Sequence, residues 1–153
     1  MKLATLCYVE KDERYLMLHR NKVENDMHQG MWVGLGGKFE PGESPEECVI
    51  REVFEESGLQ ITNPKLRGIL TFPNNFNIED WYVFLFTATD FSGTLKQCNE
   101  GTLEWVEKSK VSTLPMYEGD YLFLNGIDEH NSVFSIKYNY QDDVLKDYKL
   151  TFY

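Results

Sequence analysis

The sequence predicts a single domain built as an α+β or mixed α/β sandwich. Apolar, strand-like stretches lie on both sides of one strongly marked helix, and they do not alternate with helices in a regular βαβ order. We find no internal repeat, low-complexity tract or linker. The length of 153 residues suits one domain with a substantial core, so we expect residues 1–153 to form a single unit.

The expected strands flank the central helix in sequence. They are residues 2–10, 14–20, 31–37, 65–72, 81–89, 102–107, 132–140 and 144–153. A polar turn at 11–13 joins the first two strands, and the last two form a closing hairpin around 141–143. A polar loop at 21–30 precedes the strand 31–37, and a second, short helix is expected at 119–128.

The central helix has the clearest boundaries in the chain. Ser44 can cap its N-terminus, Pro45 suits the first helical position, and Glu47 completes a capping box. Gly58 supplies a stop, so we expect a helix from Pro45 to Ser57. The apolar residues Val49, Ile50, Val53 and Phe54 recur at helical spacing and predict the face that packs on the core.

Three glutamates on this helix, Glu52, Glu55 and Glu56, are spaced three and four residues apart and share the other face. Like charges at this spacing destabilise an isolated helix by a few tenths of a kcal/mol per pair, roughly. A cation among them reverses that sign, and Mg²⁺ and Mn²⁺ prefer oxygen ligands. A solvated acidic face gives the same pattern, so the helix alone leaves both interpretations open.

Composition and charge limit the classes of function. The formal net charge of −10 disfavours binding to duplex nucleic acid, and it requires a mediating cation for any phosphate ester. The three cysteines, Cys7, Cys48 and Cys98, form no CxxC pair, which indicates a reducing compartment and argues against a thiolate metal site. We see no membrane-spanning run and no signal-peptide pattern, and therefore expect a cytoplasmic protein without a membrane partner.

The spacing of residues 37–59 decides between the two interpretations of the helix. The stretch reads G-x5-E-x7-R-E-V-x-E-E-x-G-L. It matches the Nudix box, GX5EX7REUXEEXGU with U a bulky aliphatic residue, at nine fixed positions over 23 residues. A full match of this length is a specific signal. The chain therefore resembles the Nudix hydrolases.

That resemblance implies a Nudix fold, an α/β/α sandwich around a mixed β-sheet. It also implies hydrolysis of a nucleoside diphosphate linked to another group, with Mg²⁺ as cofactor or Mn²⁺ as a substitute. Glu52, Glu55 and Glu56 are then the metal ligands and bases, together with the carbonyl of Gly36 or Gly37. Glu43 and Arg51 resemble the family's orienting pair, and Glu100 resembles a distal metal ligand, although a plain loop acid has the same appearance.

This chemistry suits the residues. A pyrophosphate is highly charged, so an acidic site can bind it only through bridging cations. Such cations neutralise phosphate charge and lower the pKa of a bound water, and a glutamate outside the tightest coordination can accept its proton. Lys38 follows the glycines and can meet a phosphate oxygen, and Arg20 can act similarly, although either can also be a solvated side chain.

The stretches "GMWVGLGGKFEPGESPEECVIREVFEESGL" and "DVLKDYKL" also resemble the MutT-type enzymes that remove pyrophosphate from oxidised purine nucleoside triphosphates. On that resemblance, six residues lie near the base pocket: Thr5, Arg20, Phe72, Trp81, Tyr117 and Asp120. The three aromatic side chains can stack on a purine, or they can simply belong to the core.

Among these enzymes, the chain resembles most closely the mammalian-type oxidised-purine triphosphatases. Two differences from that branch affect the expected substrate. That branch has asparagine where this chain has Val33, and a pair of aspartates where it has Gly119-Asp120. Loss of a hydrogen-bonding partner can change discrimination by several powers of ten. ADP-ribose, a nucleotide sugar, a dinucleoside polyphosphate or an ordinary nucleoside triphosphate therefore stay open, as does a catalytically silent nucleotide-binding module. The oligomeric state also stays open.

Overall fold

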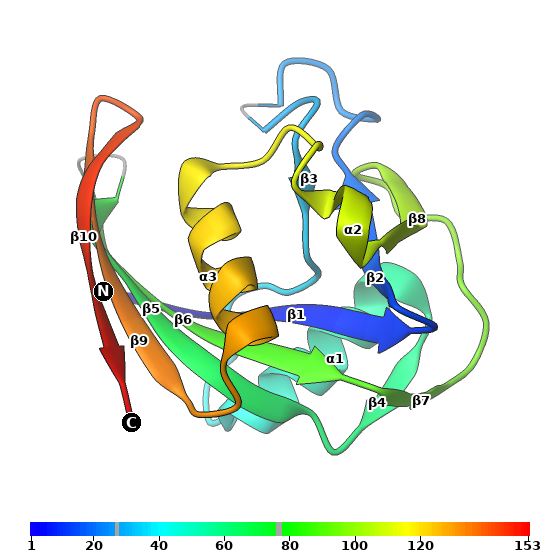
Figure 1. The fold of residues 1–153 in the computed structure, drawn as a ribbon. Coiled ribbons are helices and arrows are strands. Elements are labelled where there is room, and N and C mark those ends of the chain that lie inside the picture. Colours follow the sequence, from blue (N-terminus) through cyan, green and yellow to red (C-terminus); the bar gives the residue numbers. More distant parts are fainter. Residues whose placement is uncertain (27, 76–77) are drawn as a thin grey trace.

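The computed structural model describes residues 1–26, 28–75 and 78–153 (Figure 1). The strands are β1 (Lys2–Lys11), β2 (Arg14–His19), β3 (Trp32–Val33), β4 (Gln60–Thr62), β5 (Lys65–Asn75), β6 (Glu79–Ala88), β7 (Asp90–Ser92), β8 (Thr102–Glu107), β9 (Phe134–Gln141) and β10 (Val144–Phe152). The helices are α1 (Pro45–Ser57), α2 (Lys108–Val111) and α3 (Glu118–Glu129).

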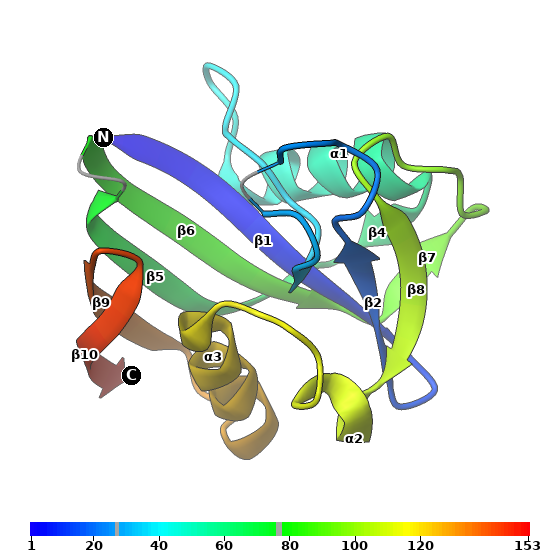
Figure 2. The ribbon, with the colours of Figure 1, turned by 90° about the horizontal axis from the view of Figure 1, so that it is seen from above.

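A mixed sheet runs through the molecule in the order β10-β9-β5-β6-β1-β2-β3, and β8 pairs with β2. The pairs β1–β6 and β5–β9 are parallel, whereas β5–β6 and β9–β10 are antiparallel. Helix α1 lies on one side of this sheet and α3 on the other (Figure 2). The predicted single domain with an α/β/α sandwich around a mixed sheet is therefore confirmed as a fold class.

Two hydrophobic clusters fill the spaces between the layers. The cluster on the α1 side includes Val49 and Val53 of the helix with Cys7 and Phe86 of the sheet. The cluster on the α3 side includes Phe123 of that helix with Tyr8 and Leu85 of the sheet. Successive residues of β1 and β6 therefore point into opposite cores, as the pleat of a strand requires.

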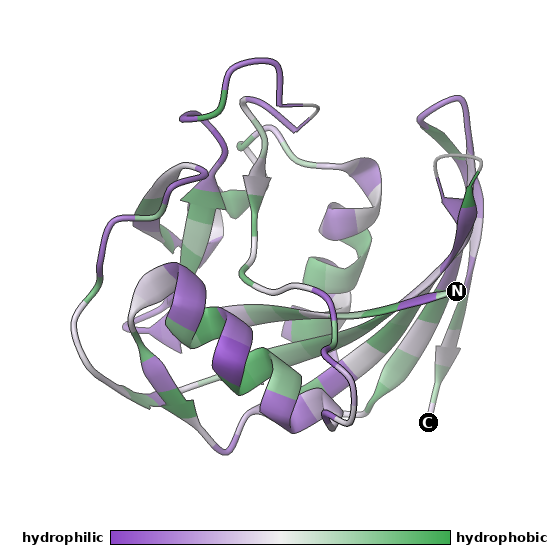
Figure 3. Ribbon diagram, turned by 180° about the vertical axis from the view of Figure 1, so that it is seen from behind, coloured by the Kyte–Doolittle hydropathy of each residue, from purple (hydrophilic) through white to green (hydrophobic). Residues whose placement is uncertain are grey.

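Helix α1 begins and ends where its sequence signals predict. The Ser44 Oγ accepts a hydrogen bond from the Glu47 N–H at 3.1 Å, and Gly58 ends the helix with φ at 81°, a left-handed conformation that glycine adopts easily. Apolar residues face the sheet and polar residues face outward (Figure 3).

The expected core position of Phe54 was wrong. Its side chain is 50% exposed, while Ser57 is fully buried. Residue 54 lies about 100° around the helix from Val53, so it falls at the edge of the buried stripe. There the Lys96 Nζ lies 5.9 Å from the Phe54 ring centroid, which covers part of the ring.

Other differences concern short elements. The expected strand 31–37 is regular only at Trp32–Val33; beyond it, Leu35 and Lys38 pair with β1 at Cys7 and Ala4 through isolated bridges. The elements β4, β7 and α2 were not predicted, since three or four residues carry too little periodicity to recognise. Within the described ranges, no helix has the length and apolar character needed to cross a membrane.

Candidate active site

Two glycines bring the backbone of the loop before α1 against the helix carboxylates. The Gly36 N–H donates a hydrogen bond to the Glu56 Oε2 at 3.2 Å. A Cβ atom added to Gly37 would lie 2.5 Å from the Glu52 carboxylate, so any larger residue would push that carboxylate aside. The loop is fixed to the sheet by the Thr5 N–H, which donates to the Gly37 carbonyl at 2.9 Å. Loop and helix together thus form a cradle lined by Glu52 and Glu56.

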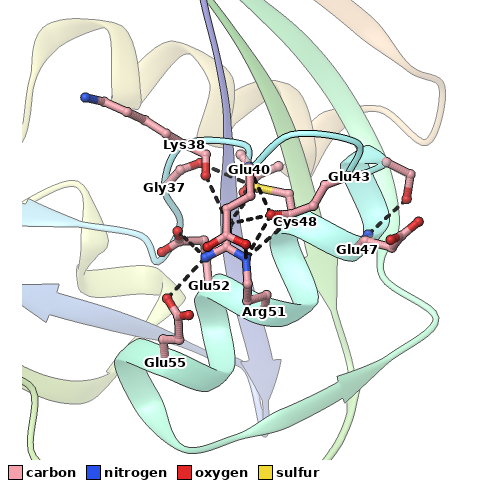
Figure 4. A network of polar contacts seen from close by, with 11 residues as sticks. Gly37, Lys38, Glu40, Glu43, Glu47, Cys48, Arg51, Glu52 and Glu55 are labelled. Atoms are coloured by element: carbon pink, nitrogen blue, oxygen red, sulfur yellow. Dashed lines mark hydrogen bonds and ion pairs between the residues drawn. The ribbon is translucent and has the colours of Figure 1, made fainter.

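Arg51 braces this cradle (Figure 4). Its Nε donates to Glu43 at 2.9 Å, and its Nη2 donates to the Lys38 carbonyl at 3.0 Å, which ties the loop to the helix. Its Nη1 contacts Glu52 at 2.8 Å and Glu55 at 3.2 Å. The structure therefore brings together Glu43, Arg51, Glu52 and Glu55, four of the five residues expected to be catalytic.

Glu56 is the fifth, and its environment differs from that of its neighbours. Burial raises the pKa of Glu56 to about 8, the nearby charges of Glu100 and Glu52 raise it as well, and the hydrogen bond from the Gly36 N–H lowers it. The positive charge of Arg20 also lowers the pKa of Glu56, but it does not offset the burial. Further positive charge is needed to favour the carboxylate. A divalent cation would supply that charge, and it would favour the ionised form of Glu56.

The donor set fits a hard divalent cation. The Glu52 and Glu56 carboxylates and the Gly36 carbonyl are oxygen ligands of the kind that Mg²⁺ and Mn²⁺ prefer. The Gly37 carbonyl already accepts from Thr5, whereas no donor contacts the Gly36 carbonyl among the described residues, which favours Gly36 of the two expected carbonyls. In the described ranges, no three Asp, Glu, His or Cys side chains lie close enough to form a metal cluster.

Glu100 lies near Glu56 but is held by a different arginine. The Arg20 Nη1 contacts the Glu100 Oε2 at 3.2 Å, and the Arg20 Nε contacts the Asp26 Oδ2 at 2.9 Å. The Lys22 N–H also donates to the Glu100 carbonyl at 3.4 Å. These contacts join the loop of Glu100 to the end of β2.

A second group of expected site residues lies on the α3 side of the sheet. Phe72 stacks on Tyr138 with ring centroids 4.8 Å apart, and Trp81 is the direct partner of Phe72 across the β5–β6 ladder, so both point to the same face. Tyr117 is the residue immediately before α3, and Asp120 lies in the first turn of that helix. Burial raises the pKa of the Asp120 carboxyl to about 7.

The packing at Gly119 explains one departure from the oxidised-purine branch. The Tyr138 hydroxyl donates to the Gly119 carbonyl at 2.9 Å, and the Gly119 N–H donates to the Tyr140 hydroxyl oxygen at 2.9 Å. A Cβ atom at Gly119 would lie 2.8 Å from both tyrosine side chains. An aspartate at this position is therefore incompatible with the tyrosine packing, and Asp120 is an acidic residue close to both tyrosines.

Two expected substrate contacts, Thr5 and Val33, lie apart from this aromatic face, whereas Lys38 lies beside Trp81. The Thr5 Oγ1 lies 3.4 Å from the Cys48 Sγ of α1, and Val33 packs against the cluster on the α1 side. The Lys38 side chain points away from the α1 carboxylates (Figure 4), with its Nζ 5.5 Å from the Trp81 ring centroid. The structure thus does not bring Thr5 and Val33 together with Phe72, Tyr117 and Asp120.

Sequence reasoning missed Asp26 and His28, which lie in the loop after β2. Asp26 pairs with Arg20, and the His28 ring meets the Tyr117 ring edge-on, with centroids 5.4 Å apart. The polar composition of residues 21–30 gives no periodic signal that could have singled out either residue.

Comparison with known proteins places this geometry in a family. The model of the NUDIX domain matches residues 2–125. The chain is 35% identical to the uncharacterized Nudix hydrolase YvcI of Bacillus subtilis (strain 168), covering 78% of this chain and 75% of the relative. It is 30% identical to the oxidized purine nucleoside triphosphate hydrolase of Danio rerio, covering 80% and 76%.

A solved structure is similar over almost the whole chain. The crystal structure of the mMutator MutT protein from Bacillus halodurans has a TM-score of 0.87 and 34% identity, covering 98% of this chain and 97% of that one. The chain therefore belongs to the Nudix family, as a hydrolase of MutT type that acts on phosphoric anhydrides. The predicted family and enzyme class are confirmed, and members of this family generally use divalent metal ions, typically Mg²⁺.

Proposed function

We propose that this protein hydrolyses a purine nucleoside triphosphate to the monophosphate and pyrophosphate, and that it prefers an oxidised base such as that of 8-oxo-dGTP. The observation that carries the proposal is Asp120, beside the aromatic face. With a pKa raised to about 7, its carboxyl is present near neutral pH both as a donor and as an acceptor of hydrogen bonds. Such a group can pair with a purine edge that also carries a donor and an acceptor.

In this proposal, Glu52, Glu56 and the Gly36 carbonyl hold Mg²⁺, with Glu55 and Glu100 as further ligands. The cation supplies charge neutralisation of the phosphates and activation of water. One of the three α1 glutamates accepts the proton of the attacking water. Arg51 and Glu43 hold the loop against the helix, and Arg20 contacts a phosphate oxygen; Lys38 does so only when its side chain turns away from the Trp81 ring.

The base binds on the α3 side in this proposal. Apolar surface for the purine comes from Phe72, Trp81 and Tyr117. The Asp120 carboxyl forms hydrogen bonds with the edge of the base. The relative from Danio rerio, named as an oxidized purine nucleoside triphosphate hydrolase, supports this assignment.

We also propose a cytoplasmic location, supported by the three buried free cysteines. The net charge of −10 supports a small nucleotide over duplex nucleic acid as partner.

A second candidate is another nucleoside diphosphate derivative, such as ADP-ribose, a nucleotide sugar or a dinucleoside polyphosphate. The observation that favours it is the tyrosine packing at Gly119, together with the α1-side position of Val33. This chain thus has fewer polar groups available to read a base edge than the oxidised-purine branch.

The test is a set of initial rates with Mg²⁺ on 8-oxo-dGTP, 2-hydroxy-dATP, dGTP, dATP, ADP-ribose and diadenosine tetraphosphate. We expect kcat/KM for an oxidised purine triphosphate to exceed that of its normal counterpart by about tenfold or more. The Asp120→Asn variant should reduce that ratio and leave the dependence on Mg²⁺ unchanged. A higher kcat/KM for ADP-ribose or the dinucleotide would overturn the proposal.

A further inference from the structure

His28 has a buried polar atom without a partner, and none of the roles described above uses it. Within the described residues, no group donates to or accepts from its Nδ1, although this atom is shielded from solvent. An unsatisfied buried polar atom costs free energy unless a ligand or water completes it. The imidazole and Tyr117 rings meet edge to face at an interplanar angle of 84°, so packing restrains the imidazole.

The loop carrying His28 is closed by contacts with Arg20. The Gly30 N–H donates to the Arg20 carbonyl at 2.7 Å, and the Arg20 N–H donates to the Met31 carbonyl at 3.0 Å. The Arg20 side chain pairs with Asp26, whose Oδ1 accepts from the His28 N–H at 3.2 Å. These contacts fix the backbone of His28 relative to the end of β2.

His28 therefore lies between the two halves of the proposed site. On one side, Arg20 also contacts Glu100, the expected distal metal ligand. On the other, Tyr117 leads into α3 and Asp120. In the proposed complex, with the phosphates over α1 and the base on the α3 side, the sugar and the base edge would lie between these groups.

The ionisation state of His28 suits a hydrogen bond with a neutral group. Burial lowers the pKa of His28, the charge of Arg20 lowers it further, and Asp26 and Glu100 raise it. A neutral imidazole has one donor nitrogen and one acceptor nitrogen. Its Nδ1 can therefore bind a ribose hydroxyl or an amino or carbonyl group of a base.

We propose that His28 is a specificity-determining residue that binds the nucleoside half of the substrate through its Nδ1, with Tyr117 holding the ring. The proposal rests on the proposed function only in taking the substrate to be a nucleotide. It assigns His28 no contact with the phosphates, which distinguishes it from Arg20 and Lys38.

The test compares His28→Ala and His28→Asn with His130→Ala as the matched control. His130 is half-exposed at the end of α3, next to Phe152. Calorimetry measures binding of inorganic pyrophosphate and of the nucleoside monophosphate released from the best substrate of the wild type. Steady-state rates give KM and kcat, and thermal unfolding checks that each variant is folded.

His28→Ala should weaken binding of the monophosphate and raise KM by about three- to tenfold, the effect of one lost hydrogen bond, with pyrophosphate binding and kcat nearly unchanged. His28→Asn should recover part of the loss because its amide can replace the imidazole nitrogen. His130→Ala should match the wild type.

Unchanged monophosphate binding in folded His28→Ala overturns the proposal, as does an equal loss of pyrophosphate binding. A wild type that prefers ADP-ribose overturns the proposed substrate but not the role of His28, since the nucleoside monophosphate is then AMP. A wild type that hydrolyses and binds no nucleotide overturns both.

Discussion

Glu56 and Asp120 are two carboxyl groups whose pKa values the fold raises for different reasons. For Glu56, burial raises the pKa most, and the negative charges of Glu100 and Glu52 raise it further, whereas the hydrogen bond from the Gly36 N–H lowers it. For Asp120, burial alone raises the pKa to about 7. Glu56 is therefore suited to a cation, whereas Asp120 is suited to a ligand that shares a proton through hydrogen bonds.

The raised pKa of Asp120 predicts a dependence of stability on pH. The folded protein binds this proton more tightly than the unfolded chain, so the contribution of Asp120 to stability falls as pH rises from about 4 to about 7 and stays lost above it. The rise from 3.8 to about 7 corresponds to at most about 4 kcal/mol. We expect Asp120→Asn to be more stable than the wild type at pH 8, and the difference to shrink toward pH 5.

Urea unfolding at several pH values measures this effect. Asp147→Asn, on the exposed strand β10, is the control and should follow the wild type at every pH. A difference in unfolding free energy between Asp120→Asn and the wild type that stays the same at every pH would contradict a raised pKa of Asp120.

At the residue scale, the structure brings together more of the residues expected at the α1 site than of those expected at the base site. The match to the Nudix box singled out Glu43, Arg51 and the three glutamates, and one helix with its preceding loop carries them all. The neighbours of Thr5, Val33 and His28 come from distant segments, so no local pattern predicts them. Cys48 beside Thr5 is 43 residues away in the chain.

At the scale of elements, the site depends on the fit between helix α1 and the loop that precedes it. The loop crosses the helix at Gly37, and Arg51 fixes it through the Lys38 carbonyl and Glu43. A methyl group added to Gly37 would therefore displace either the loop or the Glu52 carboxylate.

We therefore expect Gly37→Ala to lose most of its activity, by about 100-fold or more in kcat/KM, because misplacement by about 1 Å has effects of this size. The clash involves a flexible carboxylate, so the loss of stability should be small. Gly42→Ala is the contrasting control in the same loop. Its added Cβ meets nothing within 4 Å, but its φ of 82° disfavours alanine.

Gly42→Ala should thus cost about 1 kcal/mol of stability and leave the activity nearly intact. Steady-state rates and thermal unfolding of both variants measure the contrast. Equal activity of Gly37→Ala and the wild type would show that the close approach of Gly37 to Glu52 has no catalytic role.

The sequence predicted α1 to the residue because Ser44 and Gly58 mark both ends through local hydrogen bonds and backbone conformation. It placed α3 within one residue of its observed bounds, Glu118–Glu129. It missed β4 and β7 because each consists of three residues and depends on pairing with the other. Such elements are defined by tertiary contacts rather than by their own pattern.

At the scale of the whole molecule, the sheet separates the residues proposed to bind the phosphates from those proposed to bind the base. Residues of the α1 side, with Glu52 and Glu56, face the phosphates in the proposed complex, and residues of the α3 side face the base. Because of the net charge of −10, the protein by itself repels a triphosphate, so binding of the phosphates requires a cation. In the proposed reaction, binding of the phosphates therefore depends on metal binding by α1.

A titration with Mn²⁺, followed by electron paramagnetic resonance of the free ion, tests this claim most directly. It compares the wild type with Glu56→Gln and with Glu46→Gln, a control at an exposed position in the first turn of the same helix. We expect Glu56→Gln to weaken binding by about tenfold or more and Glu46→Gln to leave it unchanged. Equal affinities in all three proteins would contradict the account.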